Sequence, residues 1–141
     1  MEFRIFVNLH NGCFNLEASG SYCTERALEM IKQTVRHEKW AKGMNVLVDL
    51  RKVSFEAVTL VDVNQVADAV TVLEKDYGAN RCALVVPYHA YTKAAFYKFT
   101  IDLTVNLITR IFGPSGYGKA EQWIAGCGGR RPAAFSPDRS L

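Results

Sequence analysis

The first twenty residues contain two short runs in which apolar and polar side chains alternate. Phe3 to Leu9 is apolar and β-prone, Asn11-Gly12 follows, and alternation resumes from Phe14 to Ala18. Asn-Gly is a strong hairpin signal because both residues tolerate a positive φ angle. The pattern predicts a β-hairpin with one buried face.

Apolar positions then recur three times at helical spacing. The first helix is expected to start with Thr24 as its N-cap and to end near Gly43. The second is expected to start at Thr59, which forms a capping-box pattern with Asp62. The third is expected from about His89, and its predicted inner face consists of Ala95, Phe96, Phe99 and Leu103.

Short apolar runs separate these helices. Residues 45–50 and 82–86 are too short for globular helices and are typical of strands covered on both faces. Residues 106–112 predict a last strand, 113–118 a loop, and 120–125 a short helix. The sequence therefore predicts an α/β fold, a mixed sheet with an N-terminal β-hairpin followed by βαβα units and right-handed parallel crossovers.

The chain of 141 residues has the size of one domain. We expect the domain to span residues 1–125, because residues 126–141 are rich in Gly, Pro and Arg and are typical of a flexible tail. Residues 1–125 carry 14 basic and 13 acidic side chains, without the basic stripe typical of nucleic-acid binders. Nucleic acid is therefore not an expected partner.

Other features predict a cytoplasmic location. The amino terminus lacks the basic and apolar regions of a signal peptide, and no apolar run is long enough for a membrane span. The four cysteines contain no CxxC pair, and Cys82 lies in an apolar run that predicts burial. Unpaired thiols fit a reducing compartment.

Three stretches resemble the STAS superfamily, which has the SpoIIAA-like fold, and within it a poorly characterised bacterial branch. They are Gly43–Arg51 (GMNVLVDLR), Arg81–Pro87 (RCALVVP) and residues 110–124 (RIFGPSGYGKAEQWI). The resemblance covers most of residues 1–125 and implies a STAS architecture. None of the three stretches is a catalytic signature, so the resemblance implies a regulatory or interaction module rather than an enzyme.

The best-known device of that family is a regulatory phosphoserine at the start of the helix after the central strand. In this chain the corresponding stretch is residues 57–59, which contain neither Ser nor Gly. Thr59 could accept a phosphate there, since a helix N-terminus tolerates negative charge. The alternative interpretation is that Thr59 is only a helix cap.

Polar side chains follow two predicted central strands. Asp49 and Arg51 end the first strand, and Tyr88 and His89 follow the second. Ligands of open α/β sheets collect at the carboxyl ends of strands. These four residues, with Thr59 and Tyr91, form the predicted ligand- or partner-binding surface. The alternative is that they are ordinary loop residues.

Residues 113–119 match the phosphate-binding pattern GxxxxGK and lie between a predicted strand and helix. Gly113, Gly118 and Lys119 are therefore candidates for a phosphate-binding loop. However, Ala120 replaces the hydroxyl residue that binds magnesium in such loops. A turn built from Gly, Pro and Ser explains the same residues.

Three function hypotheses remain. The first is a non-catalytic module that binds a protein partner or forms a homodimer. The second is a carrier of a small apolar, lipid-like ligand, because the third predicted helix carries more aromatic side chains than one face needs: Tyr91, Phe96, Tyr97 and Phe99. The third is a degenerate nucleotide binder. No cofactor or metal is expected, since the three histidines lie in different elements without ligand spacing.

Overall fold

The computed structural model describes residues 1–8, 10, 12–78 and 81–127. The predicted hairpin is present: β1 (Glu2–Asn8) and β2 (Cys13–Ser21) pair antiparallel. Gly12 in the connection has a φ of 70°, which explains why glycine stands there. Asn11, the other predicted turn residue, lies outside the described residues.

The sheet has five strands in sequential order from β1 to β5. β3 (Val46–Ser54), β4 (Arg81–Val85) and β5 (Ile108–Phe112) run parallel to β2 and to one another. The predicted α/β class and mixed sheet are therefore confirmed.

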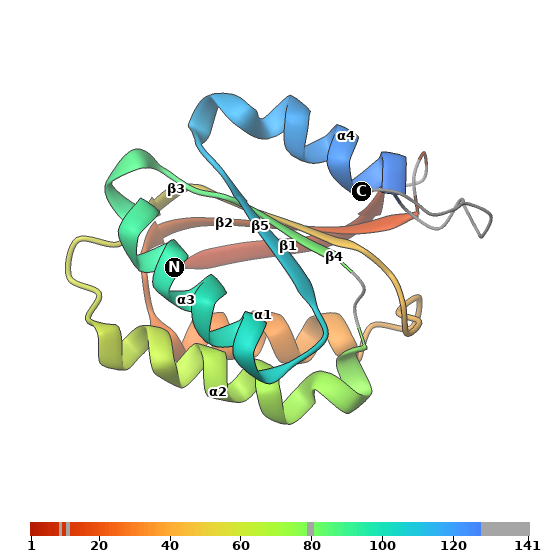
Figure 1. The fold of residues 1–141 in the computed structure, drawn as a ribbon, viewed down its shortest axis with the longest axis horizontal. Coiled ribbons are helices and arrows are strands. Elements are labelled where there is room, and N and C mark those ends of the chain that lie inside the picture. The colour runs from red at the N-terminus through yellow and green to blue at the C-terminus, as the bar shows by residue number, and fades with distance from the viewer. Residues whose placement is uncertain (9, 11, 79–80, 128–141) are drawn as a thin grey trace.

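Helices cover the two faces of the sheet unequally, as Figure 1 shows. α1 (Thr24–Val35), α2 (Leu60–Tyr77) and α3 (Tyr91–Thr104) lie on one face, and α4 (Tyr117–Cys127) lies on the other. Short 3-10 turns, η1 (Tyr88–Ala90) and η2 (Pro114–Gly116), precede α3 and α4.

Two hydrophobic cores result from the alternation of side chains along the strands. The larger core lies between the sheet and α1–α3 and includes Phe14, Val48 and Ile101. The smaller core lies under α4 and consists of Cys13, Leu47, Ala83, Val85, Phe112, Ala120 and Ile124. The buried amide of Asn45 joins the layers: its Nδ2 donates to the carbonyl oxygen of Ile124 at 3.1 Å.

The ends of α2 follow the sequence prediction. Thr59 is the N-cap, and it forms a capping box with Asp62 in which each side chain bonds the backbone of the other residue. Gly78 ends the helix in the left-handed conformation with a φ of 55°. Both ends are determined by local chemistry.

The ends of α1 correct the prediction. Its N-cap is Cys23 rather than Thr24, and the helix ends at Val35, well before Gly43. The Thr24 hydroxyl donates to the Tyr22 hydroxyl at 3.3 Å instead of capping the helix. The residues after the helix form a turn in which the Trp40 ring packs edge-on against Phe14, with 5.1 Å between ring centroids.

The boundaries at the carboxyl end also differ from the prediction. α4 begins at Tyr117, within the predicted loop, and extends to Cys127, two residues past the predicted domain end. The predicted tail of residues 126–141 therefore begins inside a helix, and its residues 128–141 lie outside the described residues.

The predicted inner face of α3 is wrong. Ala95 is exposed, and Phe99 and Leu103 are 61% and 71% exposed. The side chains that face the larger core are instead Ala90, Ala94, Tyr97 and Ile101. Both sets are apolar at helical spacing, so periodicity alone does not distinguish the inner face from the outer face.

Candidate functional site

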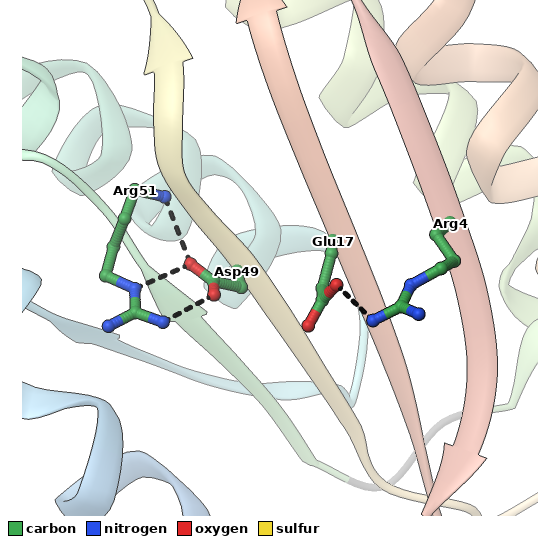
Figure 2. Close-up of polar contacts among 4 residues, drawn as sticks. All are labelled: Arg4, Glu17, Asp49 and Arg51. Carbon is green, nitrogen blue, oxygen red and sulfur yellow. Dashed lines mark hydrogen bonds and ion pairs between the residues drawn. The ribbon is translucent and has the colours of Figure 1, made fainter.

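Four charged side chains form a row across β1, β2 and β3, on the sheet face that carries α4 (Figure 2). Arg4 Nη2 donates to Glu17 Oε1 at 2.7 Å. On β3, Arg51 donates from Nε to Asp49 Oδ1 at 2.9 Å and from Nη2 to Asp49 Oδ2 at 2.7 Å. Glu17 and Asp49 are register partners across β2 and β3, so the two ion pairs are adjacent.

The position of Asp49 and Arg51 corrects the sequence prediction. β3 continues to Ser54 because its residues 52–54 still pair with β2, up to Ser21 with Ser54. Asp49 and Arg51 therefore lie inside the strand and project from one face, as residues two apart must. They do not share a surface with Thr59 and His89, which follow the ends of β3 and β4.

The positive and negative charges of the row compensate one another. Burial raises the pKa of Asp49, but the side-chain and backbone hydrogen bonds from Arg51 outweigh burial and leave this pKa below its ordinary value. The hydrogen bond to Asp49 raises the pKa of Arg51, and its guanidinium lies over the Tyr117 ring at 4.4 Å. A carboxylate held ionised by its own arginine is poorly suited to act as a general acid or base near neutral pH.

A polar recess of about 330 Å³ lies along this row. Its lining includes the four charged residues together with Glu2 and Lys52. Because the four charged residues of the row are already paired with one another, they offer little uncompensated charge to a phosphate or carboxylate ligand.

Thr59 acts as a helix cap. Its Oγ1 donates to Asp62 Oδ2 at 3.1 Å and accepts from the Asp62 backbone N–H at 3.3 Å. A phosphate on this oxygen would lose both bonds and stand beside a carboxylate. The geometry therefore favours the capping interpretation over the phosphorylation interpretation.

His89 connects two loops. Its Nε2 accepts a hydrogen bond from the Phe55 backbone N–H at 3.1 Å, and Lys93 Nζ donates to the Phe55 carbonyl oxygen at 2.7 Å. These two bonds clamp the backbone of Phe55, in the loop between β3 and α2, against η1 and α3. Tyr88 and Tyr91 take no part in the clamp, and they are 72% and 47% exposed.

The GxxxxGK segment forms a compact turn. Gly113 is the N-cap of η2 in an extended conformation, and the Gly116 N–H donates to the Gly113 carbonyl oxygen at 2.9 Å. Gly118 and Lys119 already belong to the first turn of α4, where both are exposed. The turn interpretation thus accounts for these residues without a phosphate.

The structure offers little support for metal or thiol chemistry. Among the described residues, no three His, Cys, Asp or Glu side chains gather to hold a metal ion. Burial raises the pKa of the Cys82 thiol to about 12 and that of Cys13 to about 11, so neither is poised as a thiolate nucleophile. The predicted burial of Cys82 is confirmed.

The sequence predicted two features only in outline, because the aromatic third helix indicated an apolar pocket or an interface without showing which side chains form either. One is a ridge on the outer face of α3, in which every fourth residue is apolar and exposed: Tyr91, Ala95, Phe99 and Leu103. The other is a partly open apolar cavity between the sheet and α1–α3. The i, i+4 spacing of the ridge was visible in the sequence, but nothing local marked it as the outer face.

Comparison with known proteins finds no matching family model, no matching curated protein and no matching solved structure. In the part of the chain that the structure describes, no helix combines the length and apolar character needed to cross a bilayer.

Proposed function

We propose that this chain is a non-catalytic, cytoplasmic interaction module of STAS-like (SpoIIAA-like) architecture, and that it forms a homodimer through the outer ridge of α3. The sequential strand order, the leading hairpin and the three helices on one face are compatible with that architecture. The self-neutralised charged row and the compact GxxxxGK turn favour a binding role over catalysis.

The exposed ridge of α3 carries this proposal. Phe99 and Leu103 are 61% and 71% exposed, and Tyr91 is 47% exposed. Contiguous exposed apolar surface on a globular domain marks interaction sites. On α2, exposed Val72 has Asp68 as its neighbour one turn earlier in the helix. On α3, all four positions of the ridge are apolar, and the Lys98–Asp102 ion pair lies beside them.

The shape of the ridge favours a second copy of the chain as its occupant. We place a two-fold axis between residues 95 and 99, perpendicular to α3. Antiparallel packing about this axis sets each Phe99 against the small Ala95 of the other copy and each Leu103 against Tyr91. Large side chains then face small ones, as close helix packing requires, and the contact is isologous.

The size of the ridge sets the expected strength of the dimer. From Tyr91 to Leu103 the helix rises about 18 Å. Two tyrosine rings and two phenylalanine rings would contribute most of the buried area, but only their exposed 47% and 61% is left to cover, so each adds less than the about 150–250 Å² of a fully buried ring. The ridge alone therefore falls below the size of a standard specific interface, and we expect a weak, reversible dimer.

Sedimentation velocity over a range of concentrations tests the proposal with matched variants. Phe99→Ser removes the central ring of the ridge, and Val72→Ser removes an equally exposed apolar side chain on α2. We expect the wild type and Val72→Ser to dimerise equally, and Phe99→Ser to weaken association at least tenfold. A wild type that stays monomeric, or a Phe99→Ser variant that dimerises normally, would contradict the proposal.

A further inference from the structure

A partly open apolar cavity of about 140 Å³ lies in the larger core. Its walls come from the sheet on one side and from all three covering helices on the other, with Val48, Ile31, Val66 and Ala94 among the lining residues. Protein interiors are normally packed with few voids larger than a water molecule. A void of this size lined by aliphatic side chains resembles apolar cavities that accept benzene.

One polar group in the cavity wall lacks a partner. Tyr97 of α3 lines the cavity, and its hydroxyl has no hydrogen bond to any residue that the structure describes. The Tyr22 hydroxyl, also in the wall, already accepts from Thr24. Because the Tyr97 hydroxyl is not among the oxygens that are sealed from water without a partner, it is available to donate to a molecule in the cavity.

The protonation state of Tyr97 suits it to donate a hydrogen bond. Burial raises its pKa far above the usual range, and the nearby Cys82 and Tyr22 raise it further. Tyr97 therefore keeps its proton at neutral pH. A bound molecule with an oxygen atom would satisfy this donor in a setting where water makes few other bonds.

We infer that this cavity binds a neutral, single-ring molecule that carries one hydroxyl or carbonyl oxygen, with the ring among the aliphatic side chains and the oxygen hydrogen-bonded to Tyr97. The volume fits one ring, which is a smaller ligand than the lipid-like molecule expected from the sequence. The site is also separate from the α3 ridge, because neither Tyr91 nor Phe99 lines the cavity.

Phe55 forms part of the cavity wall. Its ring packs between Tyr22 and His89, with ring centroids 5.6 and 6.3 Å apart. Its backbone bonds to His89 and Lys93 connect this loop to η1 and α3, and its carbonyl oxygen also accepts from the Val58 N–H at 3.0 Å within the loop.

Phenol and toluene form a matched pair of probes, because they share a ring and the same number of heavy atoms. Titration of the full-length protein, followed by amide NMR, measures both affinities. We expect the wild type to bind phenol more tightly than toluene. Tyr97→Phe should weaken phenol binding about three- to tenfold, which is the worth of one hydrogen bond, and leave toluene binding unchanged.

Ala94→Leu tests the cavity without any ligand. The three added carbon atoms should fill part of the void, abolish binding of both probes and raise the thermal midpoint of unfolding. A lower thermal midpoint would show that the site is already filled and would overturn the inference. Failure of both probes to bind the wild type would also overturn it, as would an equal loss of phenol and toluene in Tyr97→Phe.

Discussion

The two faces of α3 are both rich in apolar side chains, but one is buried and the other is exposed. The inner face presents Ala94, Tyr97 and Ile101 to the larger core, and the outer face presents Tyr91, Ala95, Phe99 and Leu103 to solvent. The outer side also carries polar groups, because the Lys98–Asp102 ion pair lies beside the ridge. The ridge itself is the part of α3 that we propose is covered by a partner.

The comparison also separates two kinds of incomplete packing. On the inner side the sheet covers the helix but leaves a void beside Tyr97. On the outer side nothing in the described part of the chain covers Phe99 and Leu103. The first kind suits a small molecule, and the second suits another protein surface. Substitutions on each face should therefore change different observables.

The largest expected effect is a difference in stability between the two faces. Ile101 is completely buried, so Ile101→Ala should lower the free energy of unfolding by about 3 kcal/mol. Leu103→Ala should change it by no more than about 0.5 kcal/mol, because most of that side chain is already in water. Chemical denaturation at a concentration where the protein is monomeric measures both. Equal losses would show that the two faces are equally buried.

Loss of the α2 cap is expected to have a smaller effect and provides a reference outside α3. Thr59→Ala removes the two hydrogen bonds of the Thr59 hydroxyl to Asp62, one of which is a capping-box bond, and should cost about 1 kcal/mol of stability. Thr59→Ser keeps the oxygen and should restore nearly all of it. Denaturation curves of the two variants give the comparison. If Thr59→Ala were as stable as the wild type, the cap would not contribute to the helix.

A substitution on β5 should raise the free energy of unfolding by about the amount that loss of the α2 cap lowers it. The Thr109 hydroxyl is buried and has no hydrogen-bond partner among the described residues. Thr109→Val replaces it with a methyl group of nearly the same shape and should raise the free energy of unfolding by about 1 kcal/mol. Thermal unfolding measures the change. A loss of stability would mean that the hydroxyl has a partner, such as a buried water.

The smallest expected effect concerns the charged row on the opposite face. The pKa of Asp49 is lowered in the folded state, so its carboxylate stabilises the fold above its ordinary pKa of 3.8, and this contribution is lost as pH falls below that value. Arg51→Met removes the two side-chain bonds that lower the pKa of Asp49 and keeps the bond from the backbone N–H. The variant should lose less stability than the wild type between pH 5 and pH 3, by about 1 kcal/mol at most. An identical pH dependence would contradict the role of Arg51.

The parts of the fold that the sequence predicted correctly depend on local chemistry. The hairpin and both ends of α2 follow from turn and capping residues within a few positions of one another. The extent of β3 could not be predicted in this way, because Asp49 and Arg51 have the character of loop residues. Pairing with β2, which is distant in the sequence, keeps them in the strand.

The candidate site residues could likewise be predicted only where their partners are close in the sequence. Thr59 was predicted correctly as a cap because its partner Asp62 is three residues away. The bond from the Phe55 backbone to His89 joins loops 34 residues apart, and the cavity requires side chains from the sheet and three helices. Neither has a local sequence signal. In α3, two sets of apolar residues lie at helical spacing, so the sequence is compatible with either set facing the core. Packing against the sheet determines which set does.

The central claim is that Ala95 of one copy faces Phe99 of another, and a pair of complementary variants tests it most directly. Ala95→Lys and Phe99→Glu should each be monomeric, because each places two uncompensated charges in the homodimer. When mixed, they should form a one-to-one heterodimer, since one contact becomes a Lys–Glu pair and the other remains native. Native mass spectrometry of the separate and mixed variants distinguishes these species by mass. Heterodimer formed only in the mixture is the predicted result, and a mixture that stays monomeric, or variants that still form homodimers, would contradict the account.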